Sequence, residues 1–257
     1  MAGACQTPGD DEKRPAVEVS DSGRHRMVSL RTRPGVRQPF TIVAPARPVA
    51  AAIYFRGTNG LGSVQDTGDV LPRSGVAFVL VDPPSNRPQG FWSGERSAQD
   101  HAADIDAVIR YLRQELRVPV WLVGMSMGTV SVANAALHGA AGADGVVFMA
   151  PVTAEYFGKA PFGERLVTDF PLAELKVPVL AVIHEKDACA VTPPSGAAEV
   201  VRRASRAPAR EARAVDGGYE LSSDPCVGNS YHTFAGIRAQ VAEYVADFIV
   251  KHSKQPR

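Results

Sequence analysis

The chain has 257 residues, of which 45% are hydrophobic and 21% are charged, and its formal net charge is +1. A chain of this length can bury one large core, so we expect a single α/β domain over residues 16–257 after a flexible N-terminal segment, residues 1–15. The near-neutral charge argues against a nucleic-acid partner and an anionic membrane surface, and favours a small-molecule partner. No apolar run has the length of a membrane span, and the N-terminus lacks the pattern of a signal peptide.

The first strands that the chain predicts are short and separated by turns, which is typical of an antiparallel edge. They cover residues 16–20, 26–32 and 38–45. Near-continuous apolar runs follow, and such runs indicate parallel strands that are covered on both faces. These runs cover residues 49–57, 75–82, 118–124, 143–151 and 177–187.

Helical patterns alternate with the apolar runs. The clearest covers residues 97–116, with Ser97 as its expected N-cap and one apolar stripe made of Ala102, Ile105, Val108, Ile109 and Leu112. A last strand at 210–215 and a closing amphipathic helix within 233–252 complete the alternation. We therefore predict a doubly wound, mostly parallel sheet of about eight strands, with its ligand site at the carboxyl ends of the strands.

The motif that carries chemistry is GMSMG, residues 124–128, between the apolar run at 118–124 and a helix of small residues. The pattern GxSxG places a serine on a sharp strand-to-helix turn, where small flanking residues let the hydroxyl rise above the sheet. Ser126 is then a candidate nucleophile, although a serine that only caps the helix gives the same five letters.

A serine nucleophile needs an acid and a base from later parts of the chain. Asp187 lies just past the end of the strand at 177–187, and Glu185 and His184 compete with it for the role of the acid. His232 lies in a polar loop before the closing helix, where the base is expected. The other histidines, in a lead-in, a helix face, a helix end and the C-terminus, suit the role less well: His25, His101, His138 and His252.

With Ser126, Asp187 and His232 in this order and context, the chain resembles the α/β-hydrolase superfamily from about residue 26 onward. The resemblance implies a small or absent cap, for which residues 152–176 are the candidate segment. It also implies an oxyanion hole made by the N–H groups of Met127 and Thr58. Arg56 stands where relatives often have histidine, and leaves the shape of the oxyanion loop open.

Two of the three cysteines flank the expected acid and base. Cys189 lies two residues after Asp187, and Cys226 lies six residues before His232. Since a triad brings the two loops together, a Cys189–Cys226 disulfide is sterically reasonable, and two free thiols are the alternative. The third, Cys5, follows residues that resemble the end of a bacterial lipoprotein signal. This resemblance implies a lipid anchor at Cys5, and a cysteine in a polar tail is the alternative. Either a disulfide or a lipid anchor favours a periplasmic or exported protein, and without them a cytoplasmic protein is expected.

The resemblance implies a serine hydrolase that cleaves carboxylic esters of small to medium size. A thioesterase, peptidase or acyltransferase with the same triad, and a non-catalytic ligand-binding protein, remain alternatives. The substrate-binding candidates are Arg56, Gly57, Phe91 and Trp92. Arg56 suits a substrate carboxylate or a structural salt bridge, and the two aromatic residues suit an acyl pocket or packing on the body. No motif for a metal or an organic cofactor is found, so we expect neither.

Overall fold

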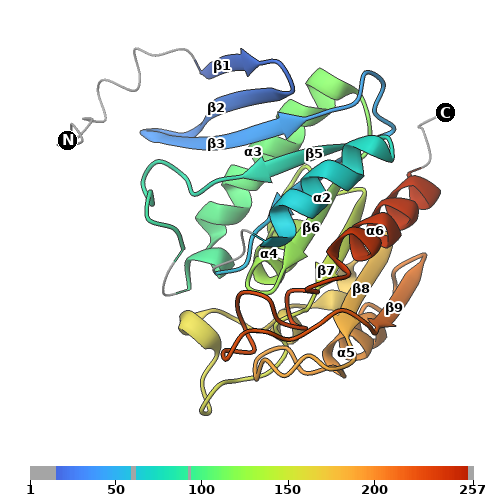
Figure 1. Ribbon diagram of the computed structural model, residues 1–257. Coiled ribbons are helices and arrows are strands. Elements are labelled where there is room, and N and C mark those ends of the chain that lie inside the picture. Colours follow the sequence, from blue (N-terminus) through green and yellow to red (C-terminus); the bar gives the residue numbers. More distant parts are fainter. Residues whose placement is uncertain (1–15, 59–61, 92–93, 254–257) are drawn as a thin grey trace.

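The computed structural model describes residues 16–58, 62–91 and 94–253, and within them nine strands form one mixed sheet. The strand order is β1-β2-β3-β5-β4-β6-β7-β8-β9. The N-terminal strands are antiparallel because tight turns join them: β1 (Val17–Ser22), β2 (His25–Arg33) and β3 (Val36–Val43). β3 also pairs antiparallel with β5 (Val76–Val81), and this pairing joins the hairpin edge to the rest of the sheet (Figure 1).

The remaining strands run parallel, as the near-continuous apolar runs predict. They are β4 (Ala50–Phe55), β6 (Val120–Met125), β7 (Gly145–Met149), β8 (Val179–His184) and β9 (Arg210–Val215), together with β5. Every residue of β4, β6, β7 and β8 is buried, whereas the edge strands β1 and β9 are largely exposed. The core therefore lies around the central strands, and their carboxyl ends point to one edge of the sheet.

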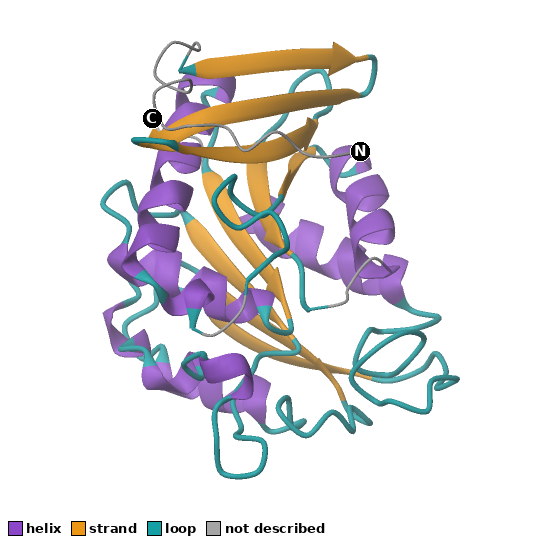
Figure 2. Ribbon diagram, turned by 90° about the vertical axis from the view of Figure 1, so that its left-hand side faces the viewer, coloured by secondary structure: helices purple, strands orange, loops and turns teal. Residues whose placement is uncertain are grey.

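Helices cover both faces of the sheet, which explains the burial of the central strands (Figures 1 and 2). α2 (Gly62–Arg73) packs on α6 (Arg238–His252) over one face, and α3 (Gln99–Leu116) packs on α4 (Gly128–His138) over the other. α5 (Gly196–Arg203) packs on β8 and β9.

The start of α3 differs from the prediction. Its apolar stripe is buried as expected, but the helix begins at Gln99, and Ser97 is not its N-cap. Ser97 lies in the 3-10 turn η1 (Glu95–Ser97), where its hydroxyl and its N–H both donate to the Glu164 carboxylate. The distant Glu164 thus holds this part of the chain in a separate turn before the helix begins.

Residues 152–176 form short 3-10 turns: η2 (Pro161–Gly163), η3 (Val167–Asp169) and η4 (Leu172–Glu174). A β-bridge between Tyr156 and Lys159 closes a small loop before η2. The segment therefore contains short turns and no long helix. Within the described residues, no helix is both long and apolar enough to cross a membrane.

Candidate active site

Ser126 lies at the sharp turn between β6 and α4. Its φ angle is 52°, in the left-handed region that serine rarely adopts. The turn is tight, because a Cβ atom at Gly124 would come within 2.4 Å of the Gly128 carbonyl oxygen, and one at Gly128 would come within 2.1 Å of the Phe55 carbonyl oxygen. Both flanking glycines of the motif are therefore required by close backbone approach.

Neighbouring polar groups hold the Ser126 backbone in this conformation. The Ser126 N–H donates to the Met149 carbonyl at 2.9 Å, and the Ser126 carbonyl accepts from the Thr129 N–H at 2.8 Å and from the Thr129 hydroxyl. The hydroxyl of Thr129 also accepts from the Val152 N–H at 3.2 Å. Thr129 thus links the serine turn to the first residues after β7, a role that the sequence did not suggest.

Asp187 and His232 are hydrogen-bonded to each other, although they are 45 residues apart in the chain. The distance from His232 Nδ1 to Asp187 Oδ2 is 2.9 Å, and the two side chains are 2% and 0% exposed. A buried carboxylate at Nδ1 fixes the orientation of the ring and leaves Nε2 for a proton on the other side. The pair is therefore arranged as an acid and a base are in a serine triad.

Two further groups support Asp187. The Cys189 N–H donates to Asp187 Oδ1 at 2.9 Å, and the Thr192 hydroxyl donates to Oδ2 at 3.0 Å. The same hydroxyl lies 3.0 Å from His232 Nδ1, so Thr192 contacts both members of the pair. Sequence reasoning missed Thr192, because a threonine in a polar loop carries no distinguishing signal.

The two competitors for the acid role face elsewhere. The buried His184 ring lies 2.8 Å from the Gly217 carbonyl oxygen, accepts from the Lys186 N–H at Nδ1, and stacks on the Tyr231 ring. Glu185 is exposed. Asp187 is therefore the carboxylate that contacts His232.

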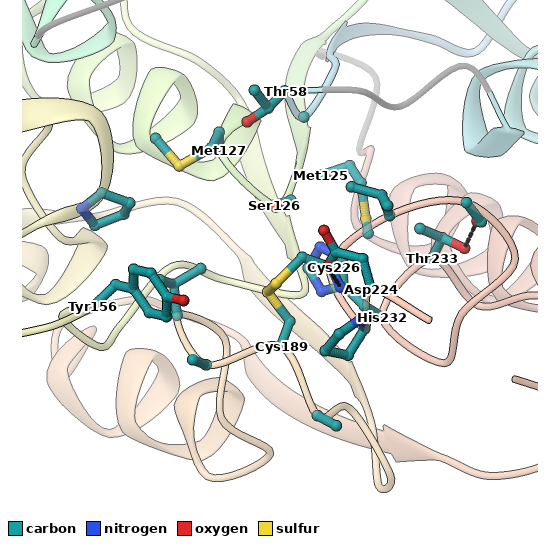
Figure 3. A pocket seen from close by; sticks show the side chains of 18 of the residues that line it. Thr58, Met125, Ser126, Met127, Tyr156, Cys189, Asp224, Cys226, His232 and Thr233 are labelled. Atoms are coloured by element: carbon teal, nitrogen blue, oxygen red, sulfur yellow. Dashed lines mark hydrogen bonds between the residues drawn. A yellow bond between two sulfur atoms is a disulfide. The ribbon is translucent and has the colours of Figure 1, made fainter. Parts of the chain in front are cut away.

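Ser126 and His232 line the same cavity, which has a volume of about 910 Å³ (Figure 3). Gly57, Thr58 and Met127 also line it. Among the described residues the Ser126 hydroxyl makes no hydrogen bond, to His232 or to any other group, so it is open to the cavity. Hydrogen bonds of this kind are often long without substrate and shorten when it binds.

The loop after β4 lies close to Ser126. A Cβ atom at Gly57 would be 3.1 Å from Ser126 Cβ, so the chain passes directly beside the serine. The N–H groups of Thr58 and of Met127, which directly precedes α4, donate to no described residue. Two free donors beside a candidate nucleophile are the arrangement that an oxyanion needs.

A disulfide joins the loop of Asp187 to the loop of His232. Cys189 and Cys226 are bonded, their Cα atoms are 4.7 Å apart, and the bridge lines the cavity (Figure 3). The bridge fixes the two loops relative to each other. Cys5 lies outside the described residues.

The other substrate-binding candidates lie away from this cavity. Arg56 pairs with Asp82 at 2.7 Å. Phe91 packs on the ring of His101 and under the guanidinium of Arg96, with centroid distances of 4.7 and 4.9 Å. Arg56 and Phe91 line a second, smaller cavity. Trp92 lies outside the described residues. In the described part of the chain, no group of three or more histidine, cysteine or acidic side chains is arranged to hold a metal ion.

Comparison with known proteins identifies the fold. No family model matches the chain, and no curated protein matches its sequence. An esterase from Pyrococcus furiosus is similar in structure, with a TM-score of 0.65, 15% identity, and coverage of 98% of this chain and 97% of the other. An esterase domain from Rhodothermus marinus has a TM-score of 0.62 and 20% identity over 88% of this chain and 98% of its own.

A third similar structure is described as an α/β serine hydrolase without a lid, from Xanthomonas campestris. It has a TM-score of 0.62 and 14% identity, and the match covers 92% of this chain and 99% of that one. The chain therefore has the α/β-hydrolase fold, as the sequence predicts.

Proposed function

We propose that the protein is a serine hydrolase that cleaves carboxylic esters, with Ser126 as nucleophile, His232 as base and Asp187 as acid. The observation that carries the proposal is the buried hydrogen bond between Asp187 and His232. His232 lines the same cavity as Ser126, and Ser126 lies on a turn with a left-handed φ angle. The three similar structures are described as esterases or as a serine hydrolase, which agrees with this reaction.

The reaction proceeds through an acyl-enzyme. The Ser126 oxygen attacks the ester carbonyl carbon while His232 Nε2 takes the hydroxyl proton, and Asp187 stabilises the charged imidazole. The N–H groups of Met127 and Thr58 donate to the oxyanion. The intermediate collapses as the proton passes from His232 to the leaving alcohol, and water then releases the acid by the same two steps.

The shape of the cavity favours substrates of modest size. Residues 152–176 form short turns, and two residues of this segment, Tyr156 and Phe162, line the cavity. The segment forms at most a minimal cap on a single domain, residues 16–257. Such a site remains open to solvent and suits a small or medium ester better than a long-chain lipid.

The disulfide also bears on the compartment. Stable disulfides form mainly in oxidising environments, so the Cys189–Cys226 bridge supports an exported or periplasmic protein. The residues before Cys5 separately suggest a lipid anchor at that cysteine.

Replacement of the nucleophile tests the proposal. We expect Ser126→Ala to lower kcat/KM for 4-nitrophenyl butyrate by roughly 10⁴-fold or more, because the covalent step is lost. The exposed Ser205→Ala is the matched control and should retain native turnover. Ester hydrolysis by the Ser126→Ala variant at the native rate would exclude the assignment, and the absence of turnover in the native protein on esters, thioesters and amides would favour a ligand-binding protein.

A further inference from the structure

A second cavity of about 230 Å³ lies behind the oxyanion loop. It shares Gly57, Thr58, Met127 and Phe162 with the larger cavity. Among the described residues, His232 and Ser126 line the larger cavity and not this one. The smaller cavity therefore adjoins the site from the side of the oxyanion donors, away from the proposed base.

A buried arginine lines this second cavity. Arg96 is 8% exposed, and its Nη1 donates to the Ser131 hydroxyl at 3.1 Å. Its guanidinium carbon lies 4.9 Å from the centre of the Phe91 ring. Among the described residues, no carboxylate oxygen lies within 4.0 Å of the guanidinium nitrogens. The guanidinium thus faces a cavity without an ion-pair partner.

The neighbouring carboxylate is occupied by other donors. Glu164 accepts from the backbone N–H of Arg96 at 2.7 Å, and from the N–H of Ser97 at 2.9 Å as well as its hydroxyl. Arg56 also lines the cavity, but it is paired with Asp82 at 2.7 Å. Glu164 also lines the cavity, and its negative charge acts on Arg96, but among the described residues no carboxylate is in direct contact with the Arg96 guanidinium.

This guanidinium remains charged at neutral pH. Burial, helped by the nearby Arg56, lowers the pKa of Arg96 to about 10, and Glu164 opposes the shift. A buried guanidinium with no carboxylate in direct contact is costly, and a ligand carboxylate that forms two parallel hydrogen bonds to it offsets part of that cost. The guanidinium N–H groups that face this cavity suit one carboxylate group of a ligand.

We propose that the second cavity binds a carboxylate on the acyl part of the substrate, with Arg96 as its partner. This inference rests on the proposed ester hydrolysis. His232 must give its proton to the leaving alcohol, so the alcohol lies on the His232 side, in the larger cavity. The acyl chain then extends past the oxyanion donors into the smaller cavity, where the guanidinium meets its far end. The substrates are accordingly half-esters of short dicarboxylic acids.

The test compares two esters of equal chain length, mono-4-nitrophenyl adipate and 4-nitrophenyl hexanoate. We expect the native protein to show a kcat/KM at least 10-fold higher for the adipate ester. Arg96→Met keeps the aliphatic stem and removes the charge, and should lower the ratio of the two kcat/KM values by roughly 30-fold, as expected for loss of a buried charge pair. Arg202→Met, at an exposed arginine on α5, is the matched control and should leave the ratio unchanged.

Further measurements separate a specificity role from a structural one. A structural role would lower thermal stability and both rates together, with no change in the ratio, whereas Arg96→Lys should restore part of the preference because it keeps the charge. An equal kcat/KM for the two esters in the native protein overturns the inference, even if no Arg96 variant folds. If neither ester is cleaved, the proposed function fails, and calorimetric titration with adipate then tests the carboxylate site by itself. Binding of adipate that Arg96→Met abolishes supports the site. No binding of adipate to the native protein overturns the inference.

Discussion

The backbone conformation of Ser126 bears on whether this residue is a nucleophile or a helix cap. A serine with a φ of 52° is unfavourable by about 1 kcal/mol relative to its ordinary conformations, and such strain tends to persist where function requires it. A serine that merely caps a helix has extended backbone and needs no left-handed turn. The observed conformation therefore favours the nucleophile over the capping role, which the five-letter motif could not do.

His101 is a second residue whose surroundings have a measurable consequence. It is 0% exposed, it packs on the rings of Phe55 and Phe91, and neither ring nitrogen has a hydrogen-bond partner among the described residues. Burial lowers the pKa of His101 to about 3, and the positive charges of Arg96 and Arg87 add to the shift. The histidine is therefore neutral in the folded protein.

The folded protein should consequently lose stability as the pH falls from about 6.5, the pKa of an unfolded histidine, toward 3, because the unfolded chain binds a proton that the folded chain cannot. His101→Leu removes this group at similar volume. Between pH 6.5 and 4.5, we expect the unfolding free energy of the native protein to fall by about 2 to 3 kcal/mol more than that of the variant. Urea denaturation at several pH values measures the difference.

At pH 7.5 the variant should be at least as stable as the native protein, because it no longer buries two unpartnered nitrogens. The exposed His25→Ala is the control and should leave the pH dependence unchanged. Parallel pH dependence in the native protein and in His101→Leu would show that His101 is not held in its neutral form.

At the scale of elements, two loops from different parts of the chain carry the proposed acid and base. One follows β8 and carries Asp187, Cys189 and Thr192, and the other precedes α6 and carries Cys226 and His232. The Asp187–His232 hydrogen bond and the disulfide both join these loops. We therefore expect the bridge both to stabilise the fold and to hold the proposed base in place.

Removal of the bridge should affect both properties. The two cysteines are 37 residues apart, and the chain-entropy estimate for a loop of this length is about 4 kcal/mol. We expect the Cys189→Ala/Cys226→Ala protein to lose about that much unfolding free energy in urea and to show a lower kcat/KM. A reductant should shift the native protein toward the variant and leave the variant unchanged. Equal stability and equal rates in the two proteins would contradict this role.

At the scale of the whole molecule, the parallel sheet brings distant residues together. Gly57 follows β4, Ser126 follows β6 and Asp187 follows β8, and in a parallel sheet the ends of these strands share one edge. The apolar runs could be identified from the sequence, and so could the residue that ends each run. The fold could therefore be predicted from the sequence, and so could the position of Ser126, Asp187 and His232, the three residues of the proposed triad, around one end of the sheet.

Other features could not be predicted, because they depend on contacts between segments that follow no periodic pattern. Ser97 looked like a helix cap, but its partner, Glu164, lies 67 residues away in the chain. Thr192 and the unpaired Arg96 are ordinary polar residues in the sequence, and only burial against Asp187 and the second cavity distinguishes them. Local patterns determine the elements, whereas the packing of loops determines the details of the site.

The most direct test of the central claim is to map the site of covalent modification by a fluorophosphonate. The probe phosphonylates a serine only when a base activates it and an oxyanion hole receives the phosphonyl oxygen. We expect rapid, stoichiometric modification, found by peptide mass spectrometry at Ser126, and loss of this modification in His232→Ala. Modification at another serine, or none in the folded native protein, would contradict the assignment of Ser126 as a nucleophile activated by His232.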